Sequence, residues 1–369
     1  MTNRIDLPFW LGLLRFPGFG PMRMKKLAAG FPSMREAFLA SAADLVRTGI
    51  EPAVAEKFVS LRATIDPVAE AARVDAAGLW ACTVLDERYP AALKTIHDPP
   101  AVLFVRGSLP AADRPWISFV GSRHATRYGL EATKRLAEPL AAAGAVIVSG
   151  LAYGVDAAAH RAALAADGTT VAVLGNGADR GNIYPPQHRA LADEIVARGG
   201  AVIAEFPPGY PSLPENFPRR NRVIAGLCRL TVVVEAAEDS GSLITARYAM
   251  EHGRDVGAVP GPIDAPLSVG PHRLIRDGAV CVTCPQDVLD ALSLAPPSPL
   301  PAPRPAYVPK NEDEKAVLGA LSPTDPRPAD AVADALGWPL HRASSLLSVL
   351  ELSGAVKDAG SAHYVRASS

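Results

Sequence analysis

Short apolar runs alternate with alanine-rich stretches from Trp116 to Val259, and this alternation is the main pattern of the chain. The runs are rich in valine and isoleucine, which favours strands buried on both faces of a sheet. The stretches between them have helical spacing, so we expect βαβ units in an α/β fold, an extended Rossmann-like doubly wound sheet. Strands are predicted at 116–120, 145–149, 169–175, 201–206, 230–235 and 255–259, and helices at 131–144, 156–168, 187–199 and 242–253.

Further segments flank this region. Residues 1–66 have helical spacing broken by prolines and glycines, which predicts a small helical domain of the helix-hairpin-helix or SAM-like type. Residues 67–107 indicate a helix and two strands that add an edge piece to the main sheet, so the Rossmann-like domain is expected at 67–294. Proline-rich sequence at 295–310 predicts an extended linker. Residues 311–369 show three helices and then two short strands, the order of a winged helix.

The charge balance excludes a strongly basic protein. The 369-residue chain has 37 lysines and arginines against 38 aspartates and glutamates, so any anion site must come from local clustering of cations. Four scattered cysteines, with a single C-x-x-C pair at Cys281 and Cys284, indicate reduced thiols without a disulfide framework or a zinc site. No apolar stretch approaches the ~20 residues of a membrane span. We expect a soluble cytoplasmic protein without metal, cofactor or membrane association.

Polar residues at the ends of the apolar runs are candidate binding groups. Parallel strands bring their carboxyl ends to one edge of a sheet, where free N–H groups and helix N-termini can hold phosphate. Each end by itself also fits an ordinary turn or a helix cap, and Ser240 is a candidate N-cap. The candidate residues are Gly121, Ser122 and Arg123, Ser149 and Gly150, and Ser240, Gly241 and Ser242.

The segment FPRRNRVIAGL is the strongest single signal of function. It places Arg219, Arg220, Asn221 and Arg222 immediately before or within the first turn of a predicted apolar helix. Cations at a helix N-terminus oppose the helix dipole, so their clustering favours an anionic partner. The alternative is a set of salt bridges within the protein, to carboxylates such as Glu205 or Glu215.

No catalytic set stands out in the sequence. A G-x-x-x-x-G-K-[ST] loop, a G-x-G-x-x-G fingerprint and a nucleophile elbow are all missing. We interpret Asp156 as a helix N-cap in preference to a catalytic acid, and His160 is placed to form an i,i+4 pair with it. We therefore expect a binding protein and not an enzyme. Two alternatives stay open: a nucleotide-processing Rossmann-like enzyme with Glu235 as acid or base, and a domain that binds a nucleotide only as a signal.

The two ends of the chain carry further candidate contacts. The turn PGFG at the N-terminus fits a helix-hairpin-helix in which Gly18 and Gly20 expose N–H groups to a DNA phosphate and Lys25 assists, although the same turn also serves for packing. The C-terminal winged helix offers His341 and Arg342 to a major groove. Its acidic residues offset its cations, so a contact with protein is favoured over one with DNA.

The ordered motifs of the central region identify a resemblance. The chain resembles the DNA processing protein A family (DprA, also called Smf) of bacterial natural transformation over residues 80–290. The motifs are YPAALKTIHDPPAVLFVRG, VGSRHATRYG, SGLAYGVDAAAH, VAVLGNGADRGNIYP, FPRRNRVIAGL, VVEAAEDSGSLITA, GRDVGAVPG and LIRDGA.

The resemblance implies a function and a set of contacts. It implies a protein that binds incoming single-stranded DNA, protects it and helps to load the recombinase RecA, and that forms a homodimer through the Rossmann-like domain. The family's positive pocket maps onto Arg123, Ser149, Gly150 and the segment 219–222. Some relatives place a lysine where this chain has Pro186, and His188 stands where asparagine is frequent. Tyr153, Tyr184 and Phe217 lie close in sequence to these motifs and are candidates for base stacking.

Overall fold

The chain is organised as two compact units, Met1–Leu300 and Pro301–Ser369. The computed structural model describes residues 6–293, 307–323, 325–360 and 362–367. Most of the predicted linker at 295–310 lies outside the described residues. The two units are described separately below.

The first unit contains a mixed sheet of nine strands within the described residues, in the order β1-β2-β6-β5-β4-β3-β7-β8-β9. The strands from β3 to β9 are parallel to their neighbours, whereas β2 pairs antiparallel with both β6 and β1. The predicted edge piece is therefore confirmed as β1 and β2. The bounds are β1 Trp80–Thr83, β2 Val102–Gly107, β3 Trp116–Val120, β4 Val146–Ser149, β5 Thr169–Leu174, β6 Ala201–Ala204, β7 Leu230–Val233, β8 Asp255–Ala258 and β9 Val280–Cys281.

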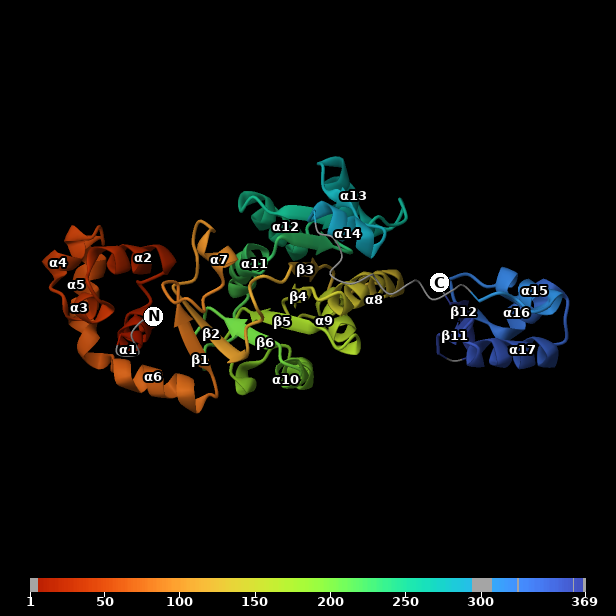
Figure 1. The fold of residues 1–369 in the computed structure, drawn as a ribbon, viewed down its shortest axis with the longest axis horizontal. Helices are drawn as coiled ribbons and strands as arrows, with labels where there is room; N and C mark the ends of the chain where they lie inside the picture. The colour runs from red at the N-terminus through yellow and green to blue at the C-terminus, as the bar shows by residue number, and fades with distance from the viewer. Residues whose placement is uncertain (1–5, 294–306, 324, 361, 368–369) are drawn as a thin grey trace. The chain divides into compact units, whose positions relative to one another are not determined.

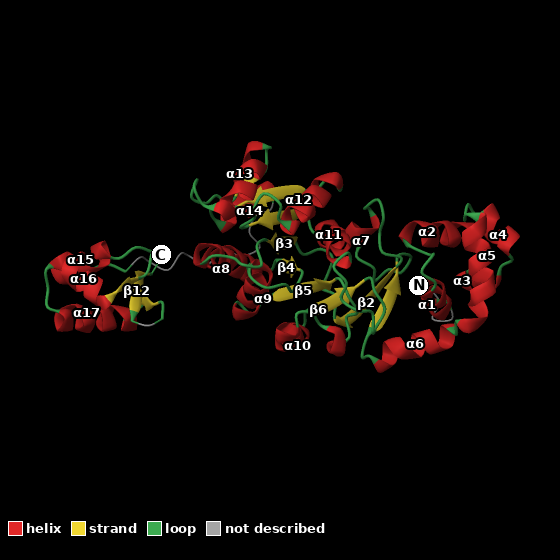
Figure 2. Ribbon diagram, turned by 180° about the vertical axis from the view of Figure 1, so that it is seen from behind, coloured by secondary structure: helices red, strands yellow, loops and turns green. Residues whose placement is uncertain are grey.

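Helices cover both faces of this sheet, as Figures 1 and 2 show. Alternation along the strands supplies an apolar side chain to each face: Val171 and Val173 of β5 enter one core, and Ala172 and Leu174 enter the other. One face packs against α7 Ala91–Lys94, α11 Asn216–Leu227, α12 Gly241–Glu251 and α13 Val269–Arg276. The opposite face packs against α8 Arg127–Ala142, α9 Val155–Ala165, α10 Arg189–Ala197 and α14 Pro285–Ala291. The predicted doubly wound α/β fold is confirmed.

The strand order reverses at β3, which has β4 on one side and β7 on the other. The chain runs outward from β3 through β4, β5 and β6, and then returns to place β7 against β3. In open α/β sheets such a reversal leaves a crevice at the carboxyl ends of the strands, where ligands bind. Short 3₁₀ turns complete the connections at Arg62–Thr64, Arg180–Asn182, Pro186–His188 and Pro266–Ser268.

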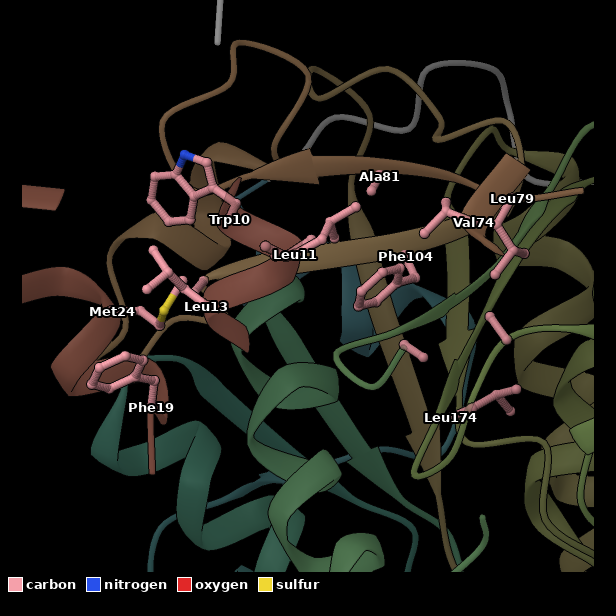
Figure 3. Close-up of a cluster of buried hydrophobic side chains, with 14 of the residues drawn as sticks. Trp10, Leu11, Leu13, Phe19, Met24, Val74, Leu79, Ala81, Phe104 and Leu174 are labelled. Atoms are coloured by element: carbon pink, nitrogen blue, oxygen red, sulfur yellow. The ribbon is translucent and has the colours of Figure 1, made fainter. Parts of the chain in front are cut away.

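Six helices precede β1 in the described residues, and the first and the last of them contact that strand. Trp10 and Leu13 of the first helix belong to the same hydrophobic cluster as Phe104 of β2 and Leu174 of β5, as Figure 3 shows. The domain boundary between residues 66 and 67 stays a prediction, because this cluster extends across it. The bounds are α1 Leu7–Arg15, α2 Pro21–Gly30, α3 Met34–Leu39, α4 Ala42–Arg47, α5 Pro52–Leu61 and α6 Pro67–Ala76.

The second unit has the predicted winged-helix order. It consists of α15 Glu312–Ala320, β10 Arg327–Pro328, α16 Ala329–Leu336, α17 Leu340–Leu352, β11 Val356–Asp358 and β12 His363–Arg366. Strand β10, which the sequence pattern did not predict, pairs with β12 to complete a three-stranded sheet. Gly337 ends α16 in the left-handed conformation, with φ of 64°. None of the helices in the described part of the chain has the length and apolar character needed to cross a membrane.

Candidate nucleic-acid interface

The loop that follows β3 lies at the point where the strand order reverses. Ser122 N donates a hydrogen bond to the Glu235 carbonyl oxygen at 2.7 Å, which joins the loop to the end of β7. A Cβ at Gly121 would lie 2.6 Å from the Val155 side chain, so only glycine lets the loop pass this close to α9. The loop leaves Arg123 exposed at the carboxyl edge of the sheet.

Arg123 lies over an aromatic ring from another part of the chain. Its guanidinium carbon is 5.3 Å from the centroid of the Phe217 ring, and the Tyr184 ring lies 5.9 Å from the same ring. Tyr184 is 46% exposed. Within the described residues Arg123 has no carboxylate at ion-pair distance. The three residues therefore present a cation with free donors beside two aromatic rings.

Tyr153, the third predicted stacking residue, lies on the loop between β4 and α9 and is 42% exposed. Its hydroxyl donates to Gln187 Oε1 at 2.7 Å, and its ring meets the His188 ring edge-on at 5.0 Å. His188 is buried, with Nδ1 2.8 Å from the Leu151 carbonyl oxygen. The buried His188 ring therefore packs against the Tyr153 ring on its inner side, and His188 itself does not reach the surface.

Arg220 lies inside the protein at the ends of β4 and β5. Its Nη1 donates to the carbonyl oxygens of Gly150, at 2.8 Å, and Val173. Burial lowers the pKa of the guanidinium to about 10 and raises the pKa of the neighbouring Asp156 carboxyl. Ser149 is also buried, and its hydroxyl donates to the Phe119 carbonyl oxygen at 2.6 Å. Arg220 thus joins the ends of β4 and β5 inside the protein, and Ser149 joins the ends of β4 and β3.

The predicted N-cap role of Asp156 is wrong. Gly154 is the N-cap of α9, and Asp156 Oδ2 instead accepts from the backbone nitrogens of Gly150 and Ala152, at 3.0 and 3.3 Å. The i,i+4 pair with His160 does not form either. The His160 Nδ1 atom lies 2.7 Å from Thr170 Oγ1 of β5. Hydrogen bonds from the loop between β4 and α9 thus replace the predicted cap, and the spacing of residues in the sequence does not reveal them.

The remaining two arginines of the cluster share one buried carboxylate. Helix α11 begins at Asn216, so the arginines lie one turn inside the helix and not before it. Arg222 Nη2 donates to Glu205 Oε2, and Arg222 Nε lies 3.0 Å from Asp98 Oδ2. Arg219 Nε lies 3.3 Å from Glu205 Oε1. Of the two carboxylates suggested by the sequence, Glu205 is thus the partner, and the structure gives no such pair for Glu215.

Exposure separates the members of this cluster. The Arg222 side chain is 3% exposed and the Arg219 side chain is 46% exposed. Burial raises the pKa of Glu205, although Arg222 and Arg219 oppose this shift. Arg219 is therefore the one cluster arginine in the described residues whose guanidinium reaches solvent.

The start of α12 is joined to α11. Ser240 caps α12, as predicted, because its hydroxyl accepts from Ser242 N at 3.4 Å. Asn221 Nδ2 donates to the Gly241 carbonyl oxygen at 3.2 Å. Gly241 is exposed, Ser240 is half-buried and Ser242 is buried. The hydrogen bond from Asn221 places the N-terminus of α12 beside α11.

Glu235 holds the N-terminus of α8. Its carboxylate accepts from Thr126 N at 2.8 Å and from Thr126 Oγ1 at 2.5 Å, and Thr126 is the N-cap of that helix. A Cβ at Gly129 would lie 2.2 Å from Glu235 Oε2, so α8 rests directly on the carboxylate. Only 5% of Glu235 is exposed. The carboxylate therefore ties β7 to α8.

Family models match most of the chain. Residues 80–293 match the model described as DNA recombination-mediator protein A, and residues 301–360 match the DprA winged helix domain. The chain belongs to the DNA recombination-mediator protein A family. Protein Smf of Escherichia coli strain K12 is 43% identical over 272 residues, which cover 73% of this chain and 72% of that protein. DNA processing protein DprA of Streptococcus pneumoniae strain R6 is 46% identical over 207 residues, which cover 56% of this chain and 72% of that protein.

Solved structures of the DNA recombination-mediator protein A family have the same fold. DNA processing protein A of Streptococcus pneumoniae matches with a TM-score of 0.65 and 35% identity over 79% of this chain and 98% of that one. DNA processing protein A of Helicobacter pylori matches with a TM-score of 0.52 and 29% identity over 59% of this chain and 97% of that one. The Helicobacter structure is described as giving insights into the unique single-stranded DNA binding mode of that protein.

The turn of the predicted hairpin lies between α1 and α2. Gly20 is the N-cap of α2, and the Gly18 carbonyl oxygen accepts from Arg23 Nη1 at 2.8 Å. Arg23 also pairs with Glu51, and Lys26 donates to the Gly49 carbonyl oxygen at 2.7 Å. Lys25 is exposed and makes no such contact within the described residues.

The two predicted groove contacts of the winged helix, His341 and Arg342, lie in the first turn of α17. Arg342 pairs with Asp313 at 2.6 Å, and its guanidinium carbon lies 4.2 Å from the centroid of the Trp338 ring. Its neighbour His341 is also exposed on α17.

The two cysteines of the C-x-x-C pair, Cys281 and Cys284, are free and exposed. The described residues contain no group of three or more histidine, cysteine, aspartate or glutamate side chains placed to hold a metal.

Proposed function

We propose that the chain binds single-stranded DNA without sequence preference along the carboxyl edge of its sheet, and acts as a recombination mediator in natural transformation. The observation that carries the proposal is the Arg123–Phe217–Tyr184 cluster at the strand reversal. Single-stranded DNA binds where a cation follows its backbone and aromatic rings stack on its bases. Family membership and the single-stranded DNA binding mode described for the Helicobacter protein support the same ligand.

The candidate residues divide into two roles within this proposal. Direct contact with the strand is assigned to the candidates that are exposed or half-buried. The exposed ones are Arg123, Tyr153, Tyr184, Arg219 and Gly241, and the half-buried ones are Gly121, Ser122, Phe217, Asn221 and Ser240. The buried set positions the loops that carry those contacts: Ser149, Gly150, Arg220, Arg222 and Ser242. A buried guanidinium acts through the carbonyl and carboxylate groups it holds, because it cannot reach a phosphate without a rearrangement of the core.

The test is an equilibrium titration of fluorescent oligo-dT with the full chain and with Arg123→Ala. The substitution should weaken binding about tenfold and make the dependence of log affinity on log salt shallower by about 0.7, the value for one phosphate contact on a single strand. Arg161→Ala is the matched control, because Arg161 is also exposed on this domain but lies in the second turn of α9. No binding by the wild type up to high micromolar protein overturns the proposal, as does an equal loss in both variants.

We propose that the protein is not an enzyme. A nucleotide-processing activity at this edge would use Glu235 as acid or base, but both of its carboxylate oxygens accept hydrogen bonds that fix α8. Incubation with AMP should release no adenine, and release of adenine would reverse this assignment. A thermal shift with nucleotides but none with oligonucleotides would instead favour a domain that binds a nucleotide as a signal.

We further propose that the protein forms a homodimer through its Rossmann-like domain, protects bound DNA and helps to load RecA. These steps rest on family membership. Sedimentation equilibrium should give twice the mass of one chain. Cosedimentation with single- and double-stranded DNA, with and without RecA, should show more RecA on single strands when the protein is present. RecA loading that does not depend on the protein would remove this part of the proposal.

A further inference from the structure

A second aromatic and arginine cluster lies at the end of β6. Phe206 follows this strand, and the Tyr210 ring stacks on it with centroids 4.8 Å apart and an interplanar angle of 25°. Arg219 lies over the same Phe206 ring, with its guanidinium carbon 5.5 Å from the centroid. Phe206 is 5% exposed, whereas Tyr210 is half-buried. The buried ring therefore supports both an accessible aromatic ring and an accessible cation.

The loop that carries Tyr210 is held on both sides. Tyr210 N donates to the Pro207 carbonyl oxygen at 3.1 Å, and Gly177 N donates to the Tyr210 carbonyl oxygen at 3.0 Å. Gly209, with φ of 81°, turns the chain, and its nitrogen donates to Asp179 Oδ1 at 2.9 Å. Because its loop is fixed in this way and its ring already stacks on Phe206, Tyr210 loses little conformational freedom when a flat ligand stacks on it.

The two Nη groups of Arg219 are free to meet an anion. The side chain makes an ion contact with Glu205, but within the described residues its guanidinium donates no hydrogen bond. Glu205 accepts its one guanidinium hydrogen bond from the buried Arg222. The N–H groups on the two Nη atoms of Arg219 thus stay available, and their planar arrangement suits a phosphate oxygen.

The second cluster lies next to the first along the sheet edge. Phe217 packs over Gly175 at the end of β5, where a Cβ would be 3.2 Å from its ring. Phe206 follows β6, which pairs in parallel with β5, and neighbouring strands lie ~4.8 Å apart. Arg219 follows Phe217 by two residues in α11. Aromatic rings and arginines thus line two consecutive strand ends.

We propose that Tyr210 and Arg219 form a second subsite for a single DNA strand, in which a base stacks on Tyr210 and the adjoining phosphate meets Arg219. Phe206 is the support beneath both. The subsite rests on the proposed function, which supplies the ligand. It extends the path of the DNA strand from the Arg123–Phe217–Tyr184 cluster across β5 to the end of β6, toward the side of the sheet that ends in β2 and β1.

The test compares two oligomers of equal length, oligo-dT and an abasic deoxyribose-phosphate oligomer. Tyr210→Leu keeps apolar packing on Phe206 but removes the aromatic face, and Tyr210→Phe keeps that face. The leucine variant should bind oligo-dT about five- to a hundredfold more weakly than the wild type and should bind the abasic oligomer as the wild type does. The phenylalanine variant should bind both oligomers as the wild type does. Tyr248→Ala, a half-buried tyrosine that stacks on His252 two turns into α12, is the matched control.

The outcomes distinguish failure of the subsite from failure of the proposed DNA binding on which it rests. If the wild type fails to bind oligo-dT, the proposed function fails. If the wild type binds and Tyr210→Leu binds equally well, the subsite is overturned and the function stands. If Tyr210→Leu loses affinity equally for both oligomers, or its melting temperature falls well below that of Tyr210→Phe, the ring serves only to pack the loop and the subsite is overturned.

Discussion

The Gly150 carbonyl oxygen accepts a hydrogen bond from Arg220 Nη1 at 2.8 Å, and a Cβ at position 150 would lie 2.5 Å from the same guanidinium. The glycine and the arginine therefore depend on each other. The guanidinium fills the space that a side chain at 150 would need, and it bridges the ends of β4 and β5 through Gly150 and Val173. This bridge fixes the edge from which Tyr153 projects.

Gly150→Ala should destabilise the protein by about 1–3 kcal/mol, the usual cost of overpacking a core, and should weaken oligo-dT binding as Arg220 shifts. Urea denaturation and the oligo-dT titration measure the two effects. Gly181→Ala is the control, because the nearest atom to its added Cβ is 3.8 Å away. Equal stability of the two variants would show that Arg220 can move at no cost.

Glu205→Gln should cost about 3–5 kcal/mol of unfolding free energy, because it removes the buried carboxylate and leaves the buried Arg222 with only the more exposed Asp98 as a charged partner. The two side chains are 5% and 3% exposed. Asp98→Asn is the comparison, since Asp98 is 36% exposed and solvent compensates for its loss. Urea denaturation of both variants measures the two losses of unfolding free energy. A loss for Glu205→Gln no larger than that for Asp98→Asn would contradict a buried ion pair.

Acid should destabilise the protein through His160. Burial, with help from His188, Arg220 and Arg161, lowers the pKa of His160 to about 3 in the folded chain. The unfolded chain binds the proton near pH 6.5, so this stability is complete above that pH and is lost as pH falls toward 3. The loss approaches about 1.4 kcal/mol per pH unit.

The variant His160→Gln tests this contribution. Between pH 7 and pH 5.5 the wild type should lose about 1 kcal/mol more unfolding free energy than the variant, as one fewer group takes up a proton on unfolding. Urea denaturation at the two pH values provides the measurement. Parallel losses in wild type and variant would show that His160 is protonated in the folded protein.

Lys25→Ala should weaken oligonucleotide binding if the hairpin between α1 and α2 touches DNA. Loss of one phosphate contact makes the salt dependence shallower by about one unit on duplex DNA and about 0.7 on a single strand. Lys57→Ala is the control, because Lys57 is an exposed lysine of α5 that is not on that hairpin. Identical salt dependence in both variants would assign the hairpin to packing alone.

The elements of the fold were predictable because their signals are local. The runs that form β3 to β8 are apolar at consecutive positions, which indicates strands buried on both faces of a sheet. Ser240 caps the helix that directly follows it. Arg220 has the helical spacing of Val223, Ile224 and Leu227, which are buried on α11. This spacing is the signal by which its burial could have been anticipated.

The contacts that build the site were not predictable in the same way. Asp156 accepts hydrogen bonds from the loop that precedes its helix and does not cap that helix. Glu235 accepts a hydrogen bond from Thr126, the N-cap of a helix that begins more than 100 residues earlier in the chain. The exposed Arg123 of the loop after β3 lies over the ring of Phe217, which is in the first turn of α11. Such pairs depend on which strand ends become neighbours, and each partner by itself looks like an ordinary turn residue.

The α/β class, the winged helix, the family and the edge at which polar residues gather could all be predicted from the sequence, because periodicity and ordered motifs are properties of the chain read in order. The accessibility of each member of the arginine cluster could not, because it depends on the folded chain. Burial depends on the direction in which each position of α11 faces once the sheet is assembled. That packing places Arg220 and Arg222 inside, leaves Arg219 at the surface, and brings Phe206 and Tyr210 beside it.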